Sequence, residues 1–282
     1  MKSLIKILVV NYNKKIVDTL TSKAIAKIKN KSVYEIIVWD NSTILEVVEF
    51  NRKHCIDLGY TFLSEGNNVS LSYLYNKVVK YLTSEQDEFY LCIFDDDSSP
   101  THDYFSEVES ICDEGEVLFF APKVSCNSLL YSPALYKPFR NEAIKIDNGL
   151  CFGPAVGVMS GTVVNSDVFK KVNFDEALMF YGIDTKFYLD ITYRENIPLF
   201  IMKYELQHSL SVSDLSELPE QEVLRRFLNV KGASSYINKG LGAKYLFSKT
   251  VIDFFVSLKL AFKYRNISFI NKGTYGLSKN EN

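Results

Sequence analysis

The stretch FYLCIFDDD, residues 89–97, decides the fold, because it joins a short apolar run to three consecutive aspartates. A run this rich in aromatic and branched side chains predicts a buried β-strand. Burying adjacent unpaired carboxylates is costly, so we expect them at the carboxyl end of the strand, where open α/β sheets bind ligands. There Asp95 and Asp97 project the same way and can both reach one hard cation, Mn2+ or Mg2+. The alternative is an acidic exit from the strand into a turn at 98–100.

The residues before this stretch follow the same pattern of apolar runs separated by helical periodicity. We expect strands at 4–10, 34–39, 60–63 and 89–94, and helices at 15–29 and 70–81. Strands that alternate with helices predict parallel βαβ units, and therefore an α/β fold. The polar clusters 11–13, 40–42 and 95–97 each follow a strand, so they should share one edge of the sheet.

The second half is less regular. Residues 129–148 predict a long loop or a pair of edge strands, and 155–164 a strand that crosses near the site. Residues 184–194 predict a helix, and 199–202 another short strand.

Composition excludes several classes of protein. The 282 residues are 47% hydrophobic and 23% charged with a net charge of −2, which is typical of a folded protein with no general affinity for nucleic acid. The five cysteines form no CxxC pair, which argues for reduced thiols in the cytoplasm. We see no cleavable signal and no apolar stretch long enough to span a bilayer.

Five motifs give the chain a resemblance to the family 2 glycosyltransferases, which have the GT-A fold, and within them to the bacterial rhamnosyltransferase-like group. They follow the family's order over roughly residues 5–208: VVNYN at 9–13, IVWDNS at 37–42, NN at 67–68 with Asn76, FDDD at 94–97, and SGTVVN at 160–165 with FDE at 174–176 and YGID at 181–184. The pair HS at 208–209 and the segment NKGTYGL at 271–277 are also similar. Each motif alone is weak, but their joint order is specific.

The resemblance implies a role for each candidate residue. The residues on the donor side, which would hold the base, ribose and phosphates of a nucleotide sugar, are Asn11, Asn13, Asp40, Asn41, Asn68, Asn76, Asp95 and Asp96. Within the DxD motif Asp97 would bind the metal directly, Asp95 would reach the metal through water or bind the ribose, and His208 would lie beside the metal. Asp184 would be the catalytic carboxylate.

Some of these residues have a second interpretation. Asp40 would accept a hydrogen bond from a pyrimidine, but it also fits a strand-end Asx turn. Asp184 also fits a helix N-cap or first-turn acid, and His208 an ordinary loop histidine. Three positions depart from the family pattern: Val69, Ile183, and Asp190, where an arginine is common and for which Arg194 is a substitute one turn later.

The chemistry of sugar transfer matches these residue types. A divalent cation stabilises the departing diphosphate, and a carboxylate takes the proton of the attacking hydroxyl, which predicts a single displacement with inversion. We predict a hexosyltransferase that moves rhamnose, galactose or a similar sugar from a UDP- or dTDP-sugar to a surface polysaccharide, which is lipid-linked in many members of this family. The alternatives are an inactive glycosyltransferase-like partner, suggested by Ile183 and Asp190, and a sugar-1-phosphate nucleotidyltransferase. The latter needs a glycine-rich basic loop that residues 11–13 do not supply.

We expect a catalytic domain at 1–215 and a basic helical extension at 216–282. Residues 242–265 place an apolar stripe on one helix face and lysines off it: Phe247, Val251, Phe254, Phe255, Leu258, Ala261 and Phe262, with Lys249, Lys259 and Lys263. Such a helix can lie on an anionic membrane, here the inner face of the plasma membrane. The alternative is packing on the catalytic domain or on a second subunit, as in a homodimer.

Overall fold

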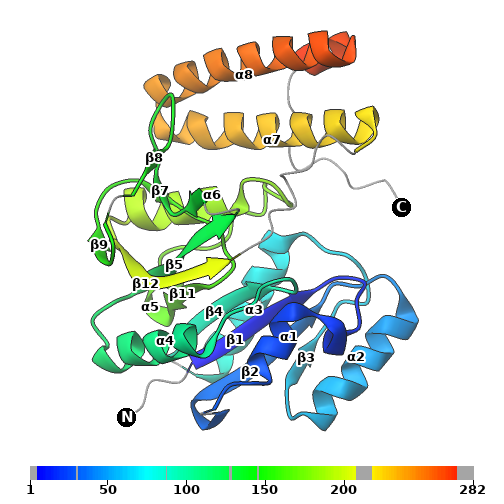
Figure 1. Cartoon of the computed structure of the whole chain (residues 1–282), viewed down its shortest axis with the longest axis vertical. Helices are drawn as coiled ribbons and strands as arrows, with labels where there is room; N and C mark the ends of the chain where they lie inside the picture. Colours follow the sequence, from blue (N-terminus) through cyan, green and yellow to red (C-terminus); the bar gives the residue numbers. More distant parts are fainter. Residues whose placement is uncertain are drawn as a thin grey trace.

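The computed structural model describes residues 5–29, 31–86, 88–126, 129–144, 146–207 and 218–271. Its main sheet has the strand order β3-β2-β1-β4-β11-β5-β12-β9, and β6 pairs with β5 outside this path (Figure 1). The strands of this sheet are β1 Ile5–Asn11, β2 Tyr34–Asp40, β3 Thr61–Leu63, β4 Tyr90–Asp95, β5 Phe119–Cys126, β6 Leu129–Ser132, β9 Gly149–Cys151, β11 Thr162–Asn165 and β12 Leu199–Gln207. A small second sheet consists of β7 Ala134–Leu135, β8 Glu142–Ala143 and β10 Ala155–Val156.

The first four strands run parallel and bring their carboxyl ends to one edge, as predicted. In register, Asn11 of β1 lies opposite Asp40 of β2, and Val10 lies opposite Asp95 of β4. β11 then pairs antiparallel with β4 and places Thr162 opposite Ile93. The three polar clusters that follow β1, β2 and β4 are therefore neighbours in space.

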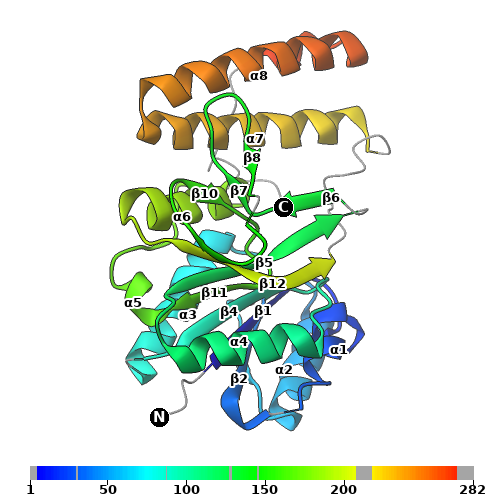
Figure 2. The same ribbon diagram turned by 60° about the vertical axis from the view of Figure 1, so that its left-hand side comes forward.

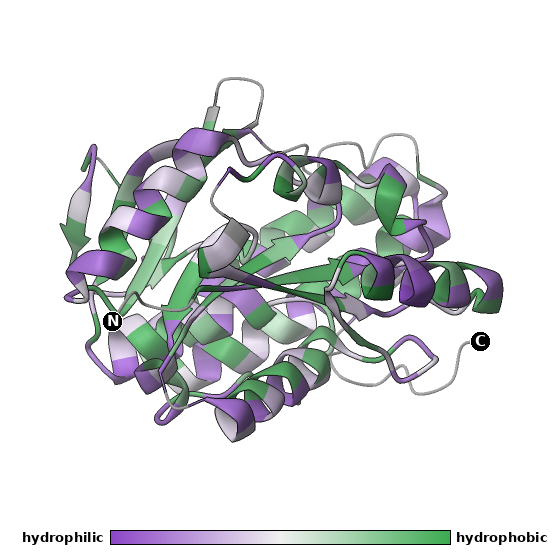
Figure 3. Ribbon diagram, turned by 90° about the horizontal axis from the view of Figure 1, so that it is seen from below, coloured by the Kyte–Doolittle hydropathy of each residue, from purple (hydrophilic) through white to green (hydrophobic). Residues whose placement is uncertain are grey.

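Helices cover both faces of this sheet. The helices and helical turns are α1 Leu20–Ile25, α2 Leu45–Asp57, α3 Leu71–Glu85, α4 His102–Glu114, α5 Ser166–Phe169, α6 Ile183–Leu189, α7 Glu220–Leu241 and α8 Ala243–Tyr264, with 3-10 turns Ile16–Asp18, Lys31–Val33 and Ile267–Ile270 and a π-turn Asp190–Arg194. Side chains of α1, α2 and α4 pack in one core, and those of α3, α5 and α6 in the other. Because both faces are buried, the central strands are mainly apolar, which Figure 3 shows as green ribbons flanked by helices that alternate green and purple.

Two predicted elements are divided in the structure. The stretch 15–29 is a 3-10 turn followed by α1, because Thr19 accepts a hydrogen bond from Ser22 N and starts a new helix there. This restart shifts the buried face, so Ile25 is buried while Leu20 is 50% exposed. The stretch 155–164 is two strands, β10 and β11, separated by a turn in which Gly161 has a φ of +83°.

The C-terminal helices α7 and α8 form an antiparallel layer on one side of the molecule (Figures 1 and 2). Ala233 and Ile237 of α7 belong to the same hydrophobic core as α3 and α6. The hairpin β7–β8 rises beside this layer, and its connecting loop reaches α8, where Ser248 Oγ donates to Pro138 O at 2.6 Å. The extension is therefore packed on the α/β body over the second half of the chain.

Candidate active site

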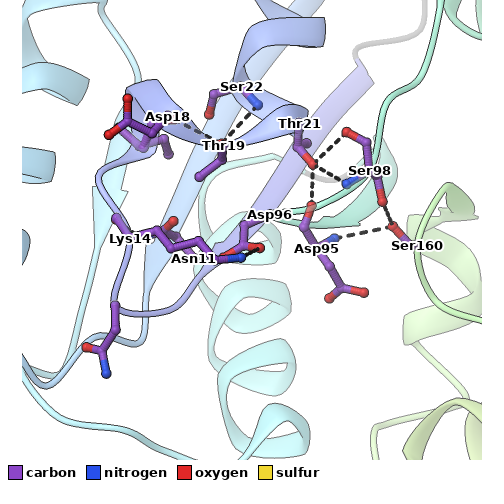
Figure 4. Close-up of polar contacts among 12 residues, drawn as sticks. Asn11, Lys14, Asp18, Thr19, Thr21, Ser22, Asp95, Asp96, Ser98 and Ser160 are labelled. Atoms are coloured by element: carbon purple, nitrogen blue, oxygen red, sulfur yellow. Dashed lines mark hydrogen bonds and ion pairs between the residues drawn. The ribbon is translucent and has the colours of Figure 1, made fainter. Parts of the chain in front are cut away.

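Buried hydroxyl groups from two other elements hold the turn that carries the aspartates. Thr21 of α1 is fully buried and its Oγ1 donates to Asp95 O, while Ser98 N donates to Thr21 Oγ1 at 3.0 Å. On the other side Ser160 Oγ accepts from Asp95 N at 3.3 Å and is hydrogen-bonded to Ser98 Oγ (Figure 4). The Asp95 carboxylate points away from all these contacts. The turn is therefore fixed from both sides, and Thr21 and Ser98 are functional candidates that the sequence motifs did not identify.

Carboxylates from β4 and α6 gather next to this turn. Burial and the neighbouring charges of Asp184, Asp97 and Asp96 raise the pKa of Asp95 to about 7. Tyr75 is buried near the cluster, and burial together with the charges of Asp95 and Asp184 raises the Tyr75 pKa well above its ordinary value. The structure thus brings Asp184 to the DxD motif across nearly ninety residues of chain.

Asp184 is the second residue of α6. The N-cap is Gly182 at a φ of +77°, so the alternative of an N-cap aspartate is wrong, although Asp184 does lie in the first turn. Its Oδ2 accepts from Met159 N at 3.0 Å, which orients the carboxylate. Burial raises the Asp184 pKa to about 6, and this rise is opposed by hydrogen bonds from the backbone N–H groups of Met159 and of Asp184 itself. Such a group is charged at neutral pH yet basic enough to take a proton.

The loops after β1 and β2 are joined by side-chain amides and hydroxyls. Asn13, at a φ of +50°, donates its N–H to Ser42 Oγ at 2.7 Å and accepts from Thr43 N at 2.9 Å. Asn11 is fully buried and donates to Lys14 O at 2.8 Å. Asn13 remains in reach of a ligand, whereas Asn11 shapes the loop from inside.

Asp40 does not face the crevice, contrary to its predicted contact with a base. It is fully buried, Oδ1 accepts from Ser42 N at 3.0 Å, and Oδ2 accepts from Asn51 Nδ2 at 2.7 Å. The first bond closes the Asx turn that was the alternative interpretation. The strand-end aspartate therefore braces α2 and the second loop.

Two of the asparagines predicted on the donor side also make internal contacts. Asn41 is buried, donates to Asn68 Oδ1 at 2.7 Å and to Val69 O at 2.9 Å, and accepts from Val69 N at 2.9 Å. Asn76 donates to Phe174 O at 2.9 Å and accepts from Phe174 N at 2.9 Å. Asn76 thus clamps α3 to the 174–176 segment, and its contact with the donor stays a prediction. Asn68 is exposed beside Asn41 and stays accessible.

Asp96 has a partner that the sequence analysis did not consider. Lys14 Nζ lies 2.7 Å from Asp96 Oδ1, with the lysine side chain 55% and the aspartate side chain 12% exposed. This pair brings a cation from the β1 loop to the edge of the carboxylate cluster. Figure 4 shows the two side chains meeting beside Asn11.

The two departures near Asp184 have structural explanations. Ile183 is 2% exposed and belongs to the core. Asp190 is buried and pairs with Lys186 in a short contact and with Arg194 at 3.1 Å. Lys186 also lies 3.6 Å from Asp175, which accepts from Tyr236 of α7 at 2.9 Å. Arg194 is therefore engaged with Asp190, and this network connects α6 to the C-terminal extension.

The turn after β4 is a candidate metal site. Asp95 and Asp97 supply two carboxylates, and no group of three His, Cys, Asp or Glu side chains within the described residues could hold a metal ion. His208 lies outside the described residues, as does most of the 271–277 motif. The donor set still fits a divalent cation, because carboxylate oxygens are the ligands that a hard cation prefers, and burial together with the charges of Asp184, Asp97 and Asp96 raises the pKa of Asp95.

A mostly parallel sheet with clustered carboxylates at its carboxyl edge is the arrangement expected of the GT-A class of glycosyltransferases. The chain belongs to glycosyl transferase family 2, whose model matches residues 6–171. It is therefore a hexosyltransferase, and the nucleotidyltransferase alternative is wrong. No curated protein matches significantly.

Solved structures support the same fold. S. aureus TarS 1–349 is 17% identical with a TM-score of 0.57, over 94% of this chain and 80% of that one. GalNAc-T7 with UDP, GalNAc and Mn2+ is 11% identical with a TM-score of 0.58, over 83% and 50%. The Pyrobaculum calidifontis mannosyltransferase PcManGT with GDP-Man and Mn2+ is 13% identical with a TM-score of 0.58, over 94% and 74%. A longer TarS chain is matched over 46% of its length.

Proposed function

We propose that this chain is an inverting, metal-dependent glycosyltransferase that uses a UDP- or dTDP-sugar such as a rhamnose or galactose donor. The observation that carries the proposal is the meeting of Asp95 with Asp184, each with a raised pKa, at the carboxyl edge of a family 2 sheet. Asp95 would help to hold the cation that stabilises the leaving diphosphate. Asp184 would take the proton of the attacking hydroxyl. Carboxyl groups with perturbed pKa values are expected at catalytic sites, where neighbouring groups have different tasks.

Asp97 and Asp95 would hold Mn2+ or Mg2+, with Asp97 as the direct ligand. When bound, the cation would supply Lewis-acid stabilisation of the leaving diphosphate. Thr21 and Ser160 keep the aspartate turn in place by bonding its backbone, so the carboxylates need no reorganisation on binding. Asp96 with Lys14, the half-buried amide of Asn13 and the exposed amide of Asn68 would line the donor side.

Asp184 would act as the general base. Its Oδ2 is held by Met159 N, and its pKa of about 6 leaves it mainly ionised at neutral pH. It would take the proton of the acceptor hydroxyl as that oxygen attacks the anomeric carbon from the side opposite the diphosphate. A single displacement of this kind inverts the anomeric configuration.

Asp184→Asn tests this role. The amide preserves shape but cannot take a proton, so we expect unchanged UDP affinity and sugar transfer lowered at least about 10²-fold. Calorimetry with UDP and Mn2+ gives the affinity, and release of UDP from a UDP-sugar gives the rate. A near wild-type rate would show that the base lies elsewhere, and Asp175→Asn would be examined next.

The preference for a pyrimidine donor rests on the family resemblance and on the UDP-GlcNAc complex of TarS, because Asp40 is buried. Thermal shift with UDP, dTDP and GDP in the presence of Mn2+ tests it, since a bound ligand raises stability by mass action. We expect UDP or dTDP to raise the melting temperature and GDP to leave it unchanged. A larger shift with GDP would assign a purine donor.

We further propose that the acceptor is a growing surface polysaccharide, carried by a lipid at the inner face of the plasma membrane. The support is the outer face of α8, where Phe247, Phe254, Phe255 and Phe262 are each more than half exposed. Lys259 and Lys263 flank this face. None of the described helices is long and apolar enough to cross a bilayer, so the contact would be peripheral.

A further inference from the structure

A cavity of about 740 Å3 opens on one side of Asp184, within the size range of small-molecule sites. The segments 130–134, 140–141 and 156–158 form its walls together with Ala143, residues 180–182 and the start of α6. Thus the candidate base forms part of the wall of a cavity that none of the proposed donor residues line. The position is that of an acceptor site.

Aromatic rings and one cation characterise this cavity. Tyr131 and Phe180 line it and are 55% and 44% exposed, so their ring faces are open to a sugar. Arg140 and Asp184 are the only charged groups among its described lining residues. Arg140 makes no ion pair within the part of the chain that the structure describes, whereas Lys137 on the same loop pairs with Glu142 at 3.9 Å.

The loop that carries Arg140 is fixed by the C-terminal helices. Tyr136 is hydrogen-bonded through its hydroxyl to Asn238 of α7 at 3.1 Å, and its ring stacks on Tyr245 of α8 with centroids 5.9 Å apart. Ser248 Oγ donates to Pro138 O at 2.6 Å. A guanidinium on a loop anchored at two points loses less conformational entropy on binding than one on a free loop.

We propose that this cavity binds a negatively charged saccharide acceptor, whose carboxylate or phosphate contacts Arg140 while its reacting hydroxyl faces Asp184. Arginine fits both groups, because its planar fork donates two hydrogen bonds to a carboxylate or a phosphate. This inference rests on the proposed function, since it takes the cavity as the acceptor side of a glycosyltransferase. It adds the chemical class of the acceptor and the residue that recognises it.

The test compares three small probes: methyl glucoside, methyl glucuronide and glucose 1-phosphate. Their binding to the full chain with UDP and Mn2+ is measured by saturation-transfer NMR titration, in wild type, Arg140→Ala and Lys137→Ala. We expect at least one anionic probe to bind wild type about tenfold more tightly than methyl glucoside, the scale of a charge-assisted hydrogen bond. Arg140→Ala should abolish this difference, and the matched control Lys137→Ala should keep it.

A preference for methyl glucuronide assigns a carboxylate acceptor, and one for glucose 1-phosphate a phosphate acceptor. Equal binding of the three probes to wild type, including failure of all three, would overturn the inference, as would equal losses in the two variants. UDP binding, measured in the same samples, separates this outcome from failure of the proposed function. If the proposed function failed, UDP itself would not bind.

Discussion

The proposed role of Asp184 as the base predicts that activity depends on pH near neutrality. Because burial raises its pKa to about 6, the base is protonated and idle in acid. We expect kcat/KM to rise with pH through about 6 and to level above it, in assays saturated with Mn2+. A rise of kcat/KM centred near pH 3.8, the ordinary pKa of an aspartate, would contradict the burial of this carboxylate.

The same shift predicts a change in stability. A raised folded pKa means that the folded chain binds this proton more tightly than the unfolded chain, so its contribution is fully present below about pH 4 and is lost as pH rises to about 6. The asparagine in Asp184→Asn does not titrate, so this variant lacks the contribution. The free energy of unfolding of wild type should therefore fall relative to Asp184→Asn across this window in urea titrations without metal. Parallel curves would rule out the linkage.

Asp97→Ala should abolish the effect of Mn2+ on UDP binding while the fold survives. Loss of a metal ligand should weaken Mn2+-dependent UDP affinity by at least about tenfold, measured by calorimetry with and without EDTA. Asp147→Ala is a suitable control, since Asp147 is a 93% exposed side chain outside the cluster. Equal UDP affinity in Asp97→Ala and wild type would remove Asp97 from the metal site.

Residue identities were predictable where a motif and its position agree. The meeting of Asp95 with Asp184 followed from the motif order, but the burial of Asp40 did not. Its carboxylate accepts hydrogen bonds from Ser42 N and from Asn51 Nδ2 of α2. No local sequence pattern predicts the contact with Asn51. The clamp that Asn76 makes was equally unpredictable, because its partner Phe174 is 98 residues away.

Among the elements, the turn after β4 depends on a helix from earlier in the chain. Thr21→Val keeps the shape of the side chain but leaves Asp95 O and Ser98 N without their buried partner. We expect a loss of about 1–3 kcal/mol in the free energy of unfolding in urea, with weaker Mn2+-dependent UDP binding. Thr250→Val, at an exposed position of α8, should change stability by less than about 0.5 kcal/mol. Equal effects of the two changes would show that Thr21 does not hold the turn.

The parallel half of the sheet was predicted well, because buried strands and short crossovers leave strong local signals. The later elements were less accessible. The π-turn Asp190–Arg194 and the division of 155–164 depend on contacts such as Thr192 Oγ1 with Ala155. The predicted helix at 15–29 is not continuous, because the capping residue Thr19 inside it starts a new helix.

At the scale of the whole molecule, the outer face of α8 predicts peripheral membrane binding. Full-length protein should bind vesicles containing phosphatidylglycerol, and binding should weaken as salt rises because lysines contribute. Replacing Phe254, Phe255 and Phe262 by Ser should abolish binding in sedimentation assays. Phe152→Ser, at a 71% exposed position outside α8, should leave it intact.

Point substitutions are preferable to removing α8, since Tyr245 and Ser248 support the loop that carries Arg140. If wild type ignores vesicles but sediments as a dimer that the triple substitution dissociates, the face is a subunit interface. The membrane proposal would then be wrong.

If the cavity beside Asp184 binds the acceptor as proposed, the attachment of the β7–β8 hairpin to α7 and α8 sets the size of the piece that would have to be exchanged between relatives to change the acceptor. Residues 134–143 transplanted alone would arrive without Asn238, Tyr245 and Ser248, the groups that hold their loop. A graft that also carries α7 and α8 would bring both halves of the contact and keep Ala233 and Ile237 against Gly182. Engineers and evolution alike would have to move the hairpin and the two C-terminal helices as one cassette.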